Sequence, residues 1–306
     1  MAAAFLPGAV AAQQSGLSEN QSFQRQFVLA NTEFTLFHEL AHVLIWELNL
    51  PVFGREEDAA DNIALMGLML LDRELPEAEQ GLVVEKLQAV ADGWELEWRL
   101  VEEDQLELAY WDLHSLEIQR YYNIACLVYG ADPKNREQIV VDTGLPLDRA
   151  EWCAEEYTLA KNAMDWLLLR MSNKPELAFK NESGRVTVVY EKNLRLHGET
   201  VDKWLHESRV AERLAKLLTE RFSLPRDITI SFEGCPFPNA SWDVDKAKVQ
   251  FCYALIERFM YLANELEKER ASLHADTQPA RKGWKSTPNS STSWRSGGGD
   301  KTGATK

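Results

Sequence analysis

The sequence lacks three features that would each have fixed its class. No stretch approaches the roughly 20 consecutive apolar residues that a transmembrane helix needs. Basic residues are too few for a nucleic-acid partner, since 33 Lys and Arg stand against 48 Asp and Glu, for a net charge of −15. The four cysteines include no C-x-x-C pair, which argues against a cysteine-based zinc site. We therefore expect neither a transmembrane protein nor one that binds nucleic acid.

The four cysteines are better explained as disulfides. Four cysteines allow three pairings, of which Cys126 with Cys153 and Cys235 with Cys252 are the local ones. An even count favours an oxidising compartment, so we expect an exported protein, periplasmic or secreted. Residues 1–14, with a small-residue pattern at 9–11, are interpreted as a signal-peptide remnant. The alternatives are four buried thiols in a cytosolic protein and an Ala-rich, disordered terminus.

The segment 38–42 reads H-E-L-A-H, and the apolar spacing of its neighbours predicts a helix that begins after an N-cap at Asn31 or Thr32. Positions i and i+4 share one face of a helix, so His38 and His42 can offer two nitrogens to one Zn²⁺. Glu39 lies at the edge of that face and is predicted to be the general base that takes a proton from water. The alternative is a pair of surface histidines on an amphipathic helix.

A second helix is predicted from about Glu56 to Leu71, after a loop through Gly54. Glu57 and Asp61 lie one turn apart on it. A catalytic zinc usually has three protein ligands, so Glu57 is predicted to be the third. Asp61 would then accept a hydrogen bond from a ligand histidine. The alternative is an ordinary acidic helix start exposed to solvent.

A peptidase of this kind also needs a donor for the oxyanion. Candidates lie between Asp112 and Tyr122, namely His114, Arg120, Tyr121 and Tyr122, and we assign a catalytic role to His114. The alternative is a capped helix start followed by aromatic side chains that pack in the core.

These motifs resemble two families. H-E-L-A-H with a later E-x-x-x-D is similar to the gluzincin group of zinc peptidases. The run 38–61 more closely resembles a family of exported bacterial proteins described as putative metallopeptidases. The segments 113–123, 126–130 and 224–227, and the pairs 239–240 and 252–253, resemble it too. The resemblance covers most of residues 31–270, and it implies a zincin-like fold and peptidase activity.

The predicted fold is α+β and mainly helical, with a small sheet from the C-terminal half. Residues 31–172 form the helical metal-binding region, and 172–184 form a linker. Residues 185–270 read as strand, helix, strand, strand, helix, with the helix at 203–222 and the strands at 185–190, 227–232 and 248–251. The tail 271–306 is predicted to be disordered.

The order of these parts differs from the family that the chain resembles, in which the strand-rich part precedes the H-E-x-x-H helix. Two interpretations remain: one domain with a permuted appearance, or a partial second copy. We favour one domain, since each half alone would leave an apolar face uncovered. The predicted function is that of a zinc-dependent peptidase. The alternative is a non-catalytic binding or structural module of the cell envelope.

Overall fold

The computed structural model describes residues 19–74, 82–105, 107–170 and 183–275. The expectations for a signal-peptide remnant at 1–14, for most of the linker at 172–184 and for most of the disordered tail at 271–306 lie outside these residues. Residues 271–275, predicted to belong to that tail, instead continue the final helix, which ends at Ala275. The helices of the first part are α1 (Glu19–Glu47), α2 (Glu56–Glu74), α3 (Leu82–Glu103), α4 (Glu117–Gly130), α5 (Glu137–Thr143), α6 (Leu147–Ala150) and α7 (Cys153–Arg170). Those of the second part are α8 (Gly198–Ser208), α9 (Val210–Arg221) and α10 (Tyr253–Ala275).

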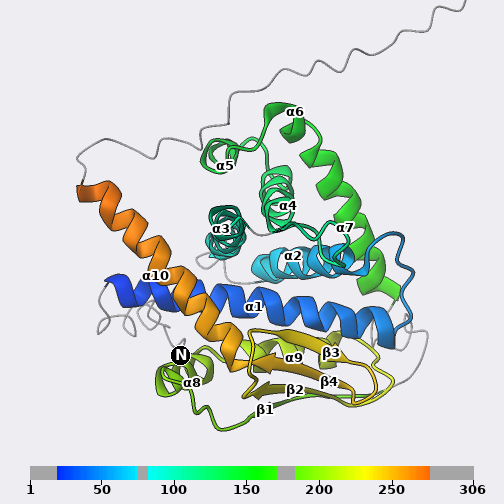
Figure 1. Cartoon of the computed structure of the whole chain (residues 1–306). Helices are drawn as coiled ribbons and strands as arrows, with labels where there is room; N and C mark the ends of the chain where they lie inside the picture. Colours follow the sequence, from blue (N-terminus) through cyan, green and yellow to red (C-terminus); the bar gives the residue numbers. More distant parts are fainter. Residues whose placement is uncertain (1–18, 75–81, 106, 171–182, 276–306) are drawn as a thin grey trace, which may run out of the picture.

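Helix α1 occupies the centre of the molecule. Figure 1 shows it between the helices α2, α3, α4 and α7 on one side and the sheet on the other. Nearly every side chain from Phe27 to Ile45 is buried, because apolar residues occupy all faces of this part of the helix. A single hydrophobic core extends from Phe27 on α1 to Leu266 on α10 and includes both parts of the chain.

The sheet has four strands in the order β1-β2-β4-β3. They are β1 (Val186–Tyr190), β2 (Ile228–Glu233), β3 (Ala240–Asp243) and β4 (Lys248–Cys252). Strands β1, β2 and β4 are parallel, and β3 pairs antiparallel with β4 and forms one edge. The architecture confirms the predicted mainly helical α+β class with a small sheet from the C-terminal half.

Three other local predictions were wrong. Helix α1 does not begin at Asn31 or Thr32, which lie inside it; the Asn31 amide donates to the carbonyls of Phe27 and Ala89, so its side chain joins α1 to α3. The single helix at 203–222 is divided, because Arg209 has a positive φ of 52°. Strand β3 was missed, since it is four residues long and contains Ser and Asp, which are rare in strands.

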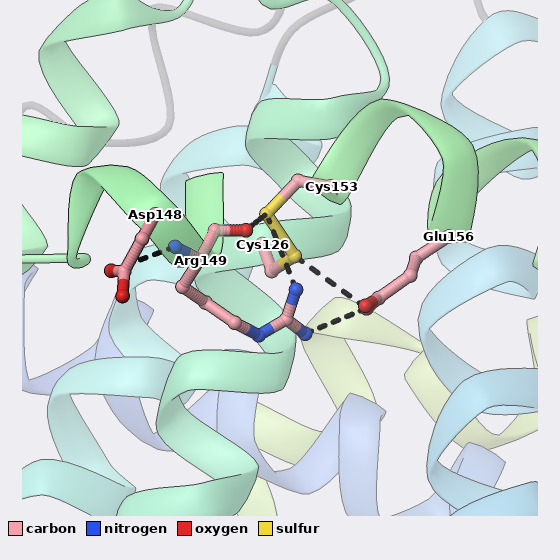
Figure 2. Close-up of a disulfide and its surroundings, with 5 residues drawn as sticks. All are labelled: Cys126, Asp148, Arg149, Cys153 and Glu156. Carbon is pink, nitrogen blue, oxygen red and sulfur yellow. Dashed lines mark hydrogen bonds and ion pairs between the residues drawn. A yellow bond between two sulfur atoms is a disulfide. The ribbon is translucent and has the colours of Figure 1, made fainter. Parts of the chain in front are cut away.

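The cysteines form the two local disulfides, Cys126–Cys153 and Cys235–Cys252. Figure 2 shows the first of them, which joins α4 to the start of α7 beside the ion pair of Arg149 and Glu156 at 2.6 Å. Gly130 permits this close approach of the two helices, because a Cβ there would lie 2.1 Å from the Cys153 carbonyl oxygen.

Removing the Cys126–Cys153 bond in a double alanine variant is expected to lower the free energy of unfolding by ~2–5 kcal/mol, mainly because the unfolded chain loses a constraint. Urea unfolding of wild type and variant measures the difference, with the Cys235–Cys252 double alanine variant for comparison. Native protein should show no titratable thiol, since all four cysteines are bonded. An unchanged unfolding midpoint would contradict the stabilising role of the first bond.

Candidate metal centre

Three polar side chains within five residues of α1 are buried together. His38, Glu39 and His42 are 4%, 6% and 8% exposed. Burying such groups is costly unless each has a partner or a function. The i, i+4 spacing places the two imidazoles on one face, with their Nε2 atoms 3.2 Å apart.

Helix α2 brings a carboxylate to the same point. Glu57 lies in its acidic first turn, and its Oε2 atom is 3.1 Å from Nε2 of both His38 and His42. The three atoms therefore form a nearly equilateral triangle. Ligands of a tetrahedral zinc with bonds of 2.0–2.1 Å lie about 3.3 Å apart, so the donor set and its spacing fit such an ion.

The second nitrogen of His38 faces Asp61. Its Nδ1 atom lies 2.8 Å from Asp61 Oδ1, and Arg120 of α4 donates two hydrogen bonds of 2.7 Å to the same carboxylate. The guanidinium also packs over the ring of Trp94, 3.6 Å from its centroid. His38, Asp61 and Arg120 are all buried, so the His38 ring is oriented by an acceptor that is itself fixed in place.

The second nitrogen of His42 faces a carboxylate that the sequence reasoning missed. Glu56 Oε1 lies 2.7 Å from His42 Nδ1 and accepts a hydrogen bond of 2.7 Å from the Trp46 indole. Each histidine of the motif therefore has its own carboxylate partner. The signal was present in the sequence, since Glu56 immediately precedes Glu57, but only the packing of α2 on α1 shows which histidine it reaches.

His114 lies at the open side of this group. Its Nε2 atom is 3.0 Å from Glu57 Oε2, and its Nδ1 atom is 3.2 Å from Asp112. His38, Glu57 and His114 each place one ligand atom within 4.8 Å of the other two. The residues around His114 are attached to α2, because the Ser115 hydroxyl donates a hydrogen bond of 2.7 Å to Asp58. Asp112 is a second residue of the site that sequence reasoning missed.

The pKa values of these side chains are shifted by burial and by their close contacts with one another. Burial opposes charge on His38, but hydrogen bonds to Asp61 and Glu57 outweigh it and raise the pKa of His38 above its usual value. Burial also opposes charge on Glu57, but hydrogen bonds from the three neighbouring imidazoles outweigh this effect. They hold the pKa of the Glu57 carboxyl far below its usual range. The hydrogen bond to Glu57 raises the pKa of His114.

Glu39 differs from its neighbours in having no salt-bridge or hydrogen-bond partner among the residues that the structure describes. Burial is the main cause that raises the pKa of its carboxyl, and the nearby imidazoles oppose the shift. A carboxylate with a raised pKa and no other partner can accept a proton from a group beside it.

A cleft of about 840 Å³ opens beside Glu39 and His42. Its walls are residues 110–114, the start of α2, and Asn239 with residues 240–242 of the edge strand β3. The Asn239 carbonyl accepts from Cys252 N–H across the sheet, so by alternation Ala240 and Trp242 direct their backbone polar groups toward the free edge. The sheet thus borders the site from the C-terminal part of the chain.

Arg226 fixes this edge strand to α1. Its guanidinium is paired with Glu47, the last residue of α1, at 2.5 Å and donates a hydrogen bond of 2.6 Å to the Val244 carbonyl just after β3. Arg226 and Glu47 are 179 residues apart in sequence. We refer to Arg226, Glu47 and Val244 as the strand clamp.

The three other candidates for the oxyanion donor have contacts elsewhere. Arg120 pairs with Asp61, and the Tyr121 hydroxyl donates to the carbonyl of Thr143, the last residue of α5, at 3.0 Å. Tyr122 is partly buried and packs against the hydrophobic core. His114 is the one of the proposed donors that the structure brings beside Glu57.

Comparison with known proteins gives one match. No curated protein and no solved structure matches the chain. A family model described as "Putative metallopeptidase" matches residues 9–169 and 190–284. The matched residues include the two helices of the candidate centre and all of the sheet except residues 186–189 of β1. Because the match covers well over half of the 306 residues, the chain belongs to the family of that description.

Proposed function

We propose that the protein is a zinc-dependent peptidase, with His38, His42 and Glu57 as the metal ligands. The observation that carries this proposal is the triangle of their three donor atoms, with sides of 3.1–3.2 Å, beside a cleft that also contains Glu39. Zinc bound there would act as a Lewis acid on the scissile carbonyl and would lower the pKa of a water molecule.

The other roles belong to side chains of the chain itself. Glu39 accepts the proton of the attacking water at its carboxylate and returns it to the leaving amine. Asp61 and Glu56 orient His38 and His42 so that Nε2 of each faces Glu57. His114, oriented by Asp112, donates a hydrogen bond to the oxyanion that develops on the substrate.

The edge strand supports a peptide as the substrate. An extended chain can add to β3 as a further strand and pair with the backbone groups of Ala240 and Trp242. Such pairing recognises a peptide backbone irrespective of its sequence. The sheet beside the proposed metal site thus comes from the C-terminal half, which supports one domain with a permuted appearance.

An exported location is part of the proposal. Two disulfides join buried or partly buried segments, and such bonds persist in oxidising compartments such as the periplasm or the exterior. In the part of the chain that the structure describes, no helix is both long and apolar enough to span a membrane.

Metal removal tests the function directly. Purified protein should contain about one zinc per chain and should cleave members of a broad peptide library. Dialysis against a chelator is expected to abolish cleavage, and equimolar zinc should restore it. His38→Ala, which removes one ligand, is the control that added zinc should not rescue. Cleavage that survives in the metal-free protein would overturn the proposal.

His114→Ala is expected to leave the zinc content at about one per chain and to lower the cleavage rate by roughly 10²–10³-fold, the usual effect of losing an oxyanion donor. Metal analysis and peptide kinetics on the same sample give both values. Asp112→Asn, which keeps the shape but weakens the orientation of His114, should show a smaller loss of rate. Loss of zinc in His114→Ala would instead make His114 a ligand.

A second candidate function is a non-catalytic envelope module that binds a partner in the same cleft. The exposed aromatic side chains of the cleft favour binding of some kind. Glu39 distinguishes the two functions, because a purely structural metal site has no use for an unpartnered buried carboxylate.

A further inference from the structure

Large apolar side chains are exposed around the cleft on two separate elements. Trp46 of α1 is 55% exposed, and Tyr110, Trp111 and Leu113 of the segment before α4 are 70–75% exposed. All four line the cleft beside Glu39 and His42. Apolar side chains gathered in one concave place, and not scattered singly, mark a binding site.

The charges of the cleft restrict what can bind there. Carboxylates line it at Glu39, Glu56, Glu57 and Asp112. The one Lys or Arg among the lining residues that the structure describes is Arg55, whose guanidinium lies 3.4 Å from the His114 carbonyl oxygen and the Ser115 hydroxyl. The four carboxylates therefore outnumber the single Arg of the cleft, and the net charge of −15 repels an acidic ligand at a distance.

From these observations we infer the substrate class: extended peptides, neutral or basic, that place an aromatic or large aliphatic side chain beside the bond to be cut. This inference rests on the proposed peptidase function and deepens it. Strand β3 holds the backbone, and the segment 110–113 together with Trp46 covers the apolar side chain. Acidic peptides and peptides of small residues are poor substrates.

Trp111 is the residue that tests this assignment. It is exposed, and among the described residues no hydrogen bond or ion pair involves its side chain, so its loss should not disturb the metal group. Trp152 is the matched control, because it is also a tryptophan, is 58% exposed and does not line the cleft.

The measurement is the binding of three fluorescein-labelled decapeptides to zinc-loaded Glu39→Gln protein, followed by fluorescence anisotropy. The peptides differ only at their two central residues, which are Phe-Leu, Gly-Ser or Asp-Glu. We expect Phe-Leu to bind at least roughly 10-fold more tightly than either other peptide, as burial of one large apolar side chain would give. Trp111→Ala should remove most of that difference, Trp111→Phe should retain it, and Trp152→Ala should not change it.

Two outcomes would overturn the inference: equal affinity for the three peptides, or an unchanged preference in Trp111→Ala. Turnover by the wild type separates this failure from failure of the proposed function. Cleavage of all three peptides at similar rates would contradict the inferred substrate class but support the proposed peptidase function. Tight, Trp111-dependent binding of the Phe-Leu peptide without any cleavage would support the apolar binding site but contradict the peptidase function.

Discussion

Replacing Glu39 with Gln is expected to lower peptide hydrolysis by roughly 10²–10⁴-fold while zinc binding and folding stay unchanged. Gln keeps the size and the hydrogen-bonding capacity of the side chain but cannot take a proton. The three proposed ligands are untouched, and the carboxylate of Glu39 has no hydrogen-bond partner in the described part of the chain whose loss could destabilise the fold. Peptide kinetics, zinc content and thermal unfolding measured on one preparation of each protein test all three expectations.

The control for this experiment is zinc dependence. Cleavage that is equal in wild type and Glu39→Gln and indifferent to chelation would come from a contaminating protease. If folded, zinc-loaded wild type cleaves nothing in a broad library, the binding-module function is the better one. Equal zinc-dependent cleavage in both proteins would remove Glu39 from the mechanism and leave another group as the base.

Replacing Glu57 with Ala is expected to abolish zinc binding, whereas Asp61→Ala should weaken it by about 10–100-fold. The reason is the position of each carboxylate: Glu57 faces Nε2 of both histidines, and Asp61 faces the opposite nitrogen of His38. Titration of metal-free protein with zinc against a competing chelator gives both affinities.

Glu56→Ala is the matched control for this series. It removes a neighbouring carboxylate that contacts Nδ1 of His42 and not Nε2, so it should weaken zinc binding about as Asp61→Ala does. Asp61→Ala also leaves the guanidinium of Arg120 buried without its partner, so unfolding must be measured beside affinity. A greater loss of zinc in Asp61→Ala than in Glu57→Ala would overturn the ligand assignment.

The part of the site that could be predicted lies on two regular helices. His38 and His42 share a face because they are four residues apart, and the same spacing places Glu57 and Asp61 on one face of α2. Periodicity carries that information within one helix. The loop between the two helices was also predicted from the sequence, because Asn and Gly are the residues that most readily adopt a positive φ. Asn49 and Gly54 both have a positive φ in the structure.

The rest depended on contacts that no local pattern records. Asp112 and Glu56 are ordinary acidic residues until the packing of α2 on α1 and of the 107–116 segment on α2 brings them to histidines. Strand β3 has weak strand propensity and is held mainly by pairing with β4 and by the strand clamp. The start of α1 was misplaced because Asn31 looks like a cap, whereas its amide bonds to a neighbouring helix.

The strand clamp has a consequence for the order of synthesis. The helix with the H-E-x-x-H motif and the strand that borders the cleft are joined through residues 179 positions apart, so the two sides of the cleft are not assembled until the C-terminal part of the chain has been made. Contacts of such long range also form late in folding. A nascent chain therefore carries the H-E-x-x-H motif before the strand that borders the cleft has been made.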